Sequence, residues 1–187
     1  MARVNKSQYA ILGFLAKRDL SGYGLLRTFA RISPFYWSES NAQVYPMLKK
    51  LEQEGMVISR LDETSGARKK RIYSITDKGK VHLMNWCKEP LPESCYREEL
   101  CLRLGLGQFL DHEVLQEKLE DFKRTLDRQR CEFVDMRRHI RDDHKDRPDQ
   151  PFLDLNLDYV EAMMDAKEKW CKHAMAQVKK IKQKEKL

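Results

Sequence analysis

The stretch Asn41-Ala-Gln-Val-Tyr-Pro-Met-Leu-Lys-Lys-Leu-Glu-Gln-Glu-Gly55 and the basic run Gly66-Ala-Arg-Lys-Lys-Arg71 decide the fold of this chain. Val44, Leu48 and Leu51 recur at spacings of four and three, which predicts a helix with one apolar face. Alternating apolar and polar residues flank the basic run and predict the two strands of a hairpin. The order helix, strand, basic hairpin, strand describes a winged helix-turn-helix. Such a helix can lie in a DNA major groove while the hairpin contacts the phosphate backbone.

The predicted recognition helix has a clear start and end. Ser40 and Gln43 fit a capping box at its N-terminus, and Gly55 fits a C-terminal cap. Pro46 removes one hydrogen bond, and an interior proline costs roughly 3 kcal/mol. A place in or near the first turn would lower that cost. From the capping box we expect the helix to begin near Ser40 or Asn41.

An N-terminal winged-helix domain is expected over residues 1–89. Its predicted helices cover 6–17, the residues between Ser21 and Pro34, the residues from Asn41 to Gly55, and a stretch that begins at Thr76 or Asp77 and carries Trp86; its predicted strands cover 56–61 and 70–75. Ser21 is a natural N-cap for the second of these helices. Two prolines within Glu89–Glu93 block regular structure and mark the domain boundary.

Residues 94–187 predict a helical domain: a short helix near 98–104 and two long helices joined by the charged loop 142–151. Apolar residues of the long helices recur at coiled-coil steps. These stripes can pack on each other within one chain or pair across a dimer. We expect a dimer, because two long helices alone would leave apolar surface uncovered. The residues assigned to this interface are Leu119, Phe122, Leu126, Phe133, Val160, Met163 and Trp170.

The expected fold is therefore mostly α, with an N-terminal winged helix-turn-helix, made of helices plus a two-stranded wing, and a C-terminal antiparallel helical dimerisation domain. The charge is divided in the same way. Residues 1–90 hold 16 Lys and Arg against 8 Asp and Glu, a net of +8, whereas residues 91–187 have a net of −1. A basic half beside a near-neutral half is typical of a nucleic-acid-binding module joined to another domain.

Several other classes of protein are disfavoured. No apolar run approaches the ~20 residues of a membrane helix, and the N-terminus lacks the pattern of a signal peptide, so we expect a cytoplasmic protein. Five cysteines without a Cys-x-x-Cys pair argue against disulfides and zinc fingers. The histidines have no metal-ligand spacing, and no nucleophile–base pattern indicates an enzyme. We expect neither a metal nor a cofactor.

Outward-facing residues of the predicted helix and residues of the basic wing are the expected contacts to double-stranded DNA. On the helix they are Ser40, Asn41, Gln43, Tyr45, Pro46, Lys49 and Lys50, and in the wing they are Gly66, Arg68, Lys69, Lys70 and Arg71. Asn and Gln side chains can pair bidentately with adenine, and lysine can reach guanine or a phosphate. A symmetric dimer presents two such helices, so an inverted-repeat operator is expected.

Short motifs in the N-terminal half also carry a family resemblance. They are Tyr9-Ala-Ile-Leu-Gly-Phe-Leu15, Ser21-Gly-Tyr23, Val44-Tyr-Pro-Met-Leu48, Leu51-Glu-Gln-Glu-Gly55 and Tyr73-Ser-Ile-Thr-Asp-Lys-Gly79. Together they resemble the PadR family of bacterial transcriptional regulators, in the branch with a long C-terminal domain. The resemblance implies a homodimer whose C-terminal helices embrace the partner, and repression that a small phenolic or hydrophobic effector relieves. The chain departs from the family pattern at Ala67, where arginine is usual, and at Gly24, where glutamate is usual.

Three alternatives stay open at this stage. Trp86 and Trp170 can line an effector pocket or simply pack in the core. A winged helix with a coiled-coil arm can also serve as a protein-interaction module without DNA binding, although the basic wing favours DNA. A few members of the resembling family activate transcription rather than repress it.

Overall fold

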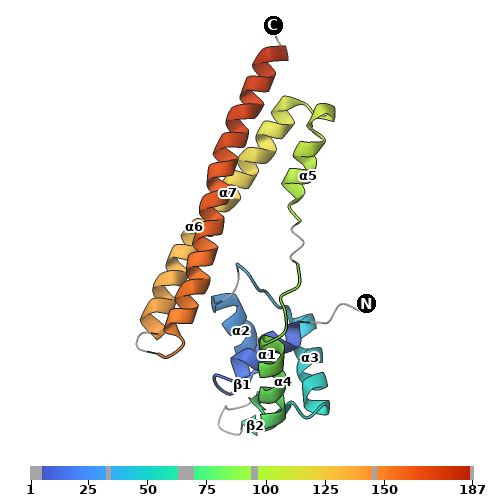
Figure 1. Cartoon of the computed structure of the whole chain (residues 1–187), viewed down its shortest axis with the longest axis vertical. Helices are drawn as coiled ribbons and strands as arrows, with labels where there is room; N and C mark the ends of the chain where they lie inside the picture. Colours follow the sequence, from blue (N-terminus) through green and yellow to red (C-terminus); the bar gives the residue numbers. More distant parts are fainter. Residues whose placement is uncertain (1–5, 33–34, 63–69, 94–96, 145–146, 186–187) are drawn as a thin grey trace. The chain divides into compact units, whose positions relative to one another are not determined.

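The computed structural model describes residues 6–32, 35–62, 70–93, 97–144 and 147–185 (Figure 1). The chain divides into two compact units, Met1–Pro92 and Glu93–Leu187. Each unit contains a hydrophobic core of its own. The mostly helical fold with a small winged-helix sheet, predicted from the sequence, is confirmed.

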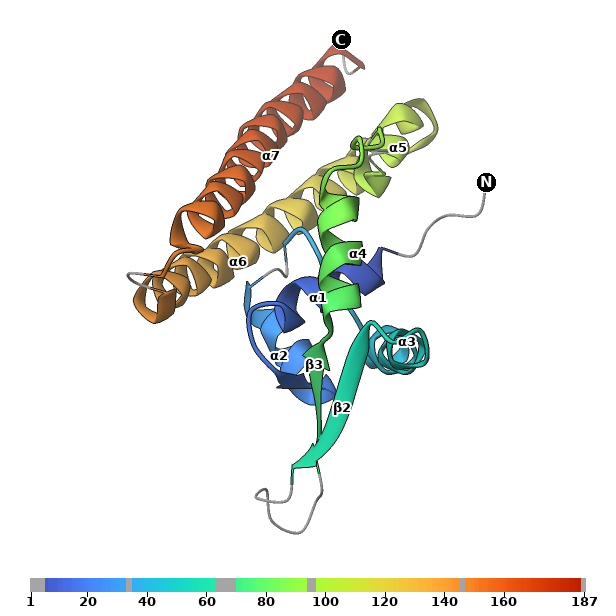
Figure 2. The same ribbon diagram turned by 60° about the horizontal axis from the view of Figure 1, so that its bottom comes forward.

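The N-terminal unit is a bundle of helices with a small sheet. Its elements are α1 (Ser7–Leu15), β1 (Leu20–Ser21), α2 (Gly22–Ile32), α3 (Asn41–Gln53), β2 (Val57–Asp62), β3 (Lys70–Ile75) and α4 (Asp77–Cys87). The strands are antiparallel in the order β1-β3-β2, and Figure 2 shows β2 beside β3. In this hairpin Ser59 lies opposite Tyr73. The hairpin strands lie within one residue of their predicted ends, and β1 is an additional strand.

The core of this unit forms around α1, α2 and α3. Ile11 and Leu12 of α1 are fully buried, as the nearly all-apolar sequence of that helix predicts. Leu25 and Phe29 pack against them from α2. Ser21 caps α2 by accepting a hydrogen bond from the Gly24 backbone N–H at 3.0 Å. The start of α2 is therefore held even though a glutamate is absent at position 24.

The C-terminal unit is dominated by a long helical hairpin. It comprises α5 (Glu99–Gly105), the short 3-10 helix η1 (Gly107–Phe109), α6 (His112–His144) and α7 (Gln150–Glu185). Buried residues at steps of three, four and seven run along the facing sides of both long helices: Leu115, Leu119, Leu126, Phe133 and Ile140 on α6, and Leu153, Leu157, Val160, Met164, Cys171 and Val178 on α7. The hairpin is thus an antiparallel coiled coil within one chain.

This packing corrects one expectation about the interface residues. Leu119, Leu126, Phe133 and Val160 do not face water in the single chain, because they form the seam between α6 and α7. The antiparallel hairpin places the two apolar stripes against each other, so no second copy is needed to cover them. Met164 rather than Met163 is the buried methionine at this level.

Two arginines hold the hairpin together beside its apolar seam. The Arg130 guanidinium pairs with Glu168 at 2.9 Å and also with Asp165. One heptad further on, Arg137 pairs with Asp158 at 2.8 Å and also with Glu161. Both arginine side chains are mostly shielded from solvent. Such forked pairs fix the register of one helix against the other.

Candidate DNA-binding surface

Helix α3 has one buried face and one exposed face. Val44, Leu48 and Leu51 are fully buried, as their spacing predicts. The residues assigned to DNA contact lie on the opposite side and are exposed: Ser40, Asn41, Gln43, Tyr45, Pro46, Lys49 and Lys50. The apolar face fixes the helix on the core and leaves a mostly polar face outward.

The start of α3 is held by its own side chains. Ser40 and Gln43 form the predicted capping box, in which Gln43 Oε1 accepts hydrogen bonds from the Ser40 backbone N–H at 2.9 Å and from the Ser40 hydroxyl at 2.8 Å. Pro46 lies in the second turn rather than the first, so it removes one bond of the helix at an exposed position. The cap opposes the fraying that this loss favours.

Tyr45 lies on the outer face of α3 and packs against the beginning of α2. A Cβ atom built on Gly22 would meet Cε1 of the Tyr45 ring at 2.6 Å. The ring therefore occupies the space that any side chain at position 22 would need. Because Tyr45 remains half exposed, this contact fixes the position of a side chain on the proposed DNA-facing surface.

The end of α3 is clamped by the first residues of α4. Gly55 adopts a left-handed conformation with φ of 70° just after the helix. The Thr76 hydroxyl donates to the Gly55 carbonyl at 2.8 Å, and Lys78 Nζ donates to the Glu54 carbonyl at 2.7 Å. Gly79 allows this approach, since a Cβ there would lie 2.2 Å from the Met56 carbonyl oxygen. These residues orient α3, a role that the sequence did not reveal.

The base of the wing is tied to α3 by a polar network. Arg71 of β3 pairs with Glu52 of α3 at 3.5 Å, and its guanidinium also donates to the Ser59 hydroxyl at 3.3 Å. Ser59 in turn donates to Glu52. Arg71 therefore has a carboxylate partner that offsets its charge, whereas Lys70 is exposed at the end of β3. The predicted wing contacts Gly66, Arg68 and Lys69 lie outside the described residues.

The two tryptophans suggested for an effector pocket each stack on an aromatic neighbour. Trp86 lies on Tyr9 with ring centroids 4.4 Å apart, and His82 stacks on the same tyrosine at 5.2 Å. Burial raises the pKa of the Tyr9 hydroxyl. Trp170 meets Phe122 edge to face at 5.9 Å. Both tryptophans thus have a packing role, and the pocket assignment stays a prediction.

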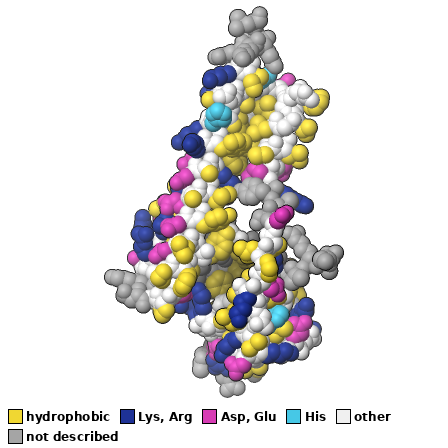
Figure 3. All heavy atoms as spheres, viewed as in Figure 1, with side chains coloured by type: hydrophobic (Ala, Val, Ile, Leu, Met, Phe, Trp, Pro, Cys, Tyr) yellow, Lys and Arg dark blue, Asp and Glu magenta, His cyan; other side chains and the backbone are white. Residues whose placement is uncertain are grey.

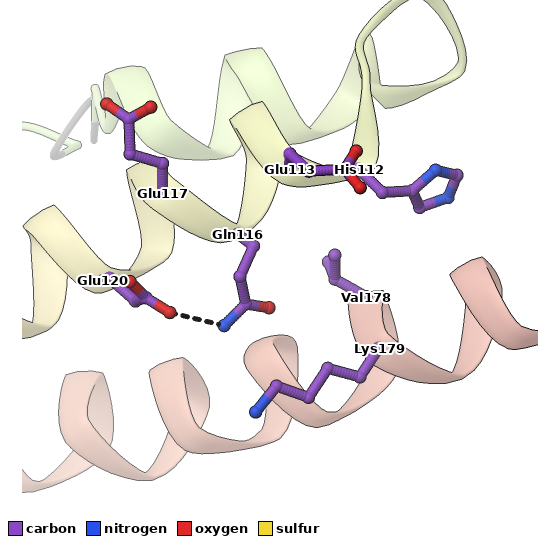
Figure 4. A pocket seen from close by; sticks show the side chains of 7 residues that line it. All are labelled: His112, Glu113, Gln116, Glu117, Glu120, Val178 and Lys179. Atoms are coloured by element: carbon purple, nitrogen blue, oxygen red, sulfur yellow. Dashed lines mark hydrogen bonds between the residues drawn. The ribbon is translucent and has the colours of Figure 1, made fainter.

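Two hollows in the C-terminal unit are lined by other residues. One, of about 300 Å³, carries mostly polar side chains of α6 with Val178 and Lys179 of α7, and Gln116 donates there to Glu120 at 3.0 Å (Figure 4). The other, of about 340 Å³, is an apolar groove between α5, η1 and α6. In the described ranges no three His, Cys, Asp or Glu side chains are placed to hold a metal ion, and no helix there is long and apolar enough to cross a membrane.

Comparison with known proteins agrees with this architecture. Residues 11–85 match the model of the Transcriptional regulator PadR-like family, and residues 96–179 match the model described as Virulence activator alpha C-term. The negative transcriptional regulator PadR of Bacillus subtilis is 34% identical over 131 residues, which are 69% of this chain and 70% of that protein. The chain belongs to the PadR-like family of transcriptional regulators.

Solved structures extend the PadR-like match over nearly the whole chain. The crystal structure of B. subtilis PadR in complex with operator DNA has a TM-score of 0.77 and 26% identity, covering 93% of this chain and 99% of that one. The structure of the same protein in complex with p-coumaric acid has a TM-score of 0.70 and 26% identity, covering 94% and 99%. The PadR-like family consists of regulators rather than enzymes, in agreement with the sequence.

Proposed function

We propose that this PadR-like protein is a bacterial, cytoplasmic, dimeric repressor that binds an inverted-repeat operator in double-stranded DNA. One α3 helix lies in the major groove of each half-site, and the β2–β3 wing contacts the neighbouring phosphates. The observation that carries the proposal is the exposed, mostly polar face of α3. The opposite face of this helix is fully buried, and hydrogen bonds hold both of its ends. The operator complex of B. subtilis PadR supports it.

Within this surface the residues divide by chemistry. Asn41 and Lys49 are exposed side chains on α3 that can reach base edges. Lys50 and Lys70 are cations suited to phosphates, together with Arg68 and Lys69 in the wing. Arg71 acts mainly through Glu52, because their ion pair joins the wing to the recognition helix.

The proposed dimer uses apolar surface that the hairpin leaves uncovered. On α7, Phe152, Leu155 and Tyr159 are exposed at steps of three and four. At the other end of the hairpin, Leu106 and Phe109 are exposed beside the apolar groove. Hydrophobic side chains, yellow in Figure 3, gather over this end of the C-terminal unit. Exposed apolar patches of this kind mark interaction sites.

The position of these two patches favours an antiparallel pair of hairpins. Helix α6 has 33 residues, so at 1.5 Å per residue the patches lie roughly 50 Å apart. In a two-fold dimer, the α7 patch of each subunit then meets the α5–η1 patch of its partner, and every contact occurs twice. The seam residues Phe133 and Val160 support this interface by packing α6 and α7 together.

Relief of repression by a small hydrophobic or phenolic effector is part of the proposal. B. subtilis PadR has been crystallised with p-coumaric acid, and an effector that prefers one arrangement of the two domains can shift the protein away from its DNA-binding form. Activation is the second candidate, because residues 96–179 match a model named for a virulence activator.

Hydroxyl-radical footprinting on the DNA upstream of the gene that encodes this protein tests the operator. The expected result is two protected half-sites related by inversion, with centres about 10–10.5 bp or twice that distance apart. Full-affinity protection of one asymmetric half-site by a single subunit would contradict a symmetric dimer.

Light scattering tests the interface. Leu155→Asp and Phe109→Asp are expected to give monomers at micromolar concentration. Val134→Asp is the matched control, since Val134 is a similarly exposed residue of α6 outside both patches, and it should remain dimeric. A dimeric Leu155→Asp variant would show that the interface lies elsewhere.

A further inference from the structure

The side chain of Gln43 is already partly engaged within the protein. Its oxygen, Oε1, accepts hydrogen bonds from both the backbone N–H and the hydroxyl of Ser40. An amide oxygen has two lone pairs, so both are used at the start of α3. The nitrogen, Nε2, keeps two N–H groups, and Gln43 is exposed on the outer face of the helix.

The orientation of this amide follows from the backbone. The Ser40 N–H lies at the beginning of α3, where the first N–H groups of a helix lack partners within it. A backbone N–H is a donor and requires an acceptor, so the oxygen end of the Gln43 amide must face it. The nitrogen end is therefore the end that remains for a partner outside the chain.

This arrangement restricts the bases that Gln43 can recognise. Bidentate pairing with adenine uses both ends of the amide, since the oxygen accepts from N6 and the nitrogen donates to N7. Gln43 can make that pair only by releasing the cap of its own helix. Asn41 lies two residues earlier, also exposed, and in the described part of the chain its amide makes no such cap.

We propose that Gln43 reads the major groove as a hydrogen-bond donor only. Its Nε2 donates to one acceptor on a base edge, namely a purine N7, guanine O6 or thymine O4, while Oε1 stays on Ser40. Asn41 is then the residue whose amide can pair with adenine through both ends. This assignment rests on the DNA-binding function proposed above and specifies what one residue of that surface recognises.

Two substitutions separate the cap from the contact. A capping box accepts glutamate as well as glutamine at this position, so Gln43→Glu keeps the acceptor for Ser40 but replaces the donor with a carboxylate. Its melting temperature should equal or exceed that of the parent, because a negative charge near a helix N-terminus is favourable. Its operator affinity should nevertheless fall at least about tenfold, since a charged carboxylate replaces a donor beside acceptors. Gln43→Ala, which removes the cap as well, should lower both quantities.

Base analogues in the operator identify the acceptor. Fluorescence anisotropy is measured with the full-length protein on duplexes that each lack one acceptor: 7-deazapurines for N7, 2-aminopurine for guanine O6, and 5-methyl-2-pyrimidinone for thymine O4. At one position per half-site, the loss should be about two- to tenfold for the parent protein and absent for Gln43→Ala. Replacing adenine with unsubstituted purine, which lacks the N6 amino group, should give no loss that depends on Gln43.

The outcomes distinguish this assignment from the function it rests on. A parent protein that binds operator and scrambled DNA equally would refute sequence-specific binding itself. If the parent is specific, a Gln43-dependent loss on removal of the N6 amino group would show bidentate adenine readout and overturn the proposal. A specific parent protein with no Gln43-dependent loss at any acceptor would overturn it as well.

Discussion

Gly79→Ala tests the clamp that α4 places on the recognition helix. The new Cβ would lie 2.2 Å from the Met56 carbonyl oxygen and 2.9 Å from Ile75 Cγ1. Carbon–oxygen contacts at such sites are normally about 3.3–3.6 Å, so the start of α4 must move by roughly 1 Å. The obstacle is backbone, which cannot rotate away as a side chain can.

Gly79→Ala has one unfavourable and one favourable effect on the free energy of unfolding. Overpacking costs about 1–3 kcal/mol, occasionally more, and a rigid carbonyl places this site at the upper end. Alanine returns up to about 1 kcal/mol of helix propensity. We expect a net destabilisation of about 2 kcal/mol, or roughly 8–15 °C in the melting temperature of a unit of this size.

Urea unfolding of the full-length protein, followed by circular dichroism, measures the effect of Gly79→Ala. Gly13→Ala is the control, because its Cβ would meet nothing within 4 Å inside α1, and it should stabilise by about 0.5–1 kcal/mol. Gly79→Ala should also weaken operator binding, since Thr76 and Lys78 would lose their hold on the end of α3. A Gly79→Ala variant as stable as Gly13→Ala would refute the clamp.

Three further predictions follow from single contacts. Gly22→Ala should lower operator affinity about three- to tenfold by displacing the Tyr45 ring. In a Tyr45→Ala background the same substitution should have little further effect. Additive losses in this double-mutant cycle would contradict the coupling between the two residues. Arg137→Ala should destabilise the hairpin by about 1–2 kcal/mol in thermal unfolding, because it breaks two interhelical ion pairs. The control is its exposed neighbour Arg138, where alanine should cost less than about 1 kcal/mol. Burial raises the pKa of the Cys171 thiol. Iodoacetamide should therefore modify Cys171 far more slowly than the exposed Cys131, as followed by mass spectrometry. Equal rates of modification would contradict the burial of Cys171.

Local patterns predicted most of the N-terminal fold. The spacing of Val44, Leu48 and Leu51 identified the buried face of α3, and Ser40 with Gln43 identified its start. Strand β1 escaped prediction because Leu20–Ser21 is too short to show alternation, and it forms only by pairing with β3.

Contacts between residues far apart in the chain could not be predicted from the sequence. The need for glycine at positions 22 and 79 arises from Tyr45 and Met56, which are more than twenty residues away. Heptad spacing correctly indicated that Leu119 and Val160 are buried, but it cannot tell a partner within the chain from a partner in a second copy. The proposed dimer contacts therefore lie on side chains that the hairpin leaves exposed.

The ratio of operator affinity to scrambled-DNA affinity shows whether α3 reads the base sequence, when this ratio is measured at several salt concentrations for Asn41→Ala and Lys70→Ala. Asn41→Ala should lose about 1–3 kcal/mol of discrimination with an unchanged salt dependence. Lys70→Ala should weaken binding to both DNAs equally and reduce the slope of log affinity against log salt by about one. Equal weakening on both DNAs by Asn41→Ala, with the ratio preserved, would contradict the claim that α3 reads the sequence.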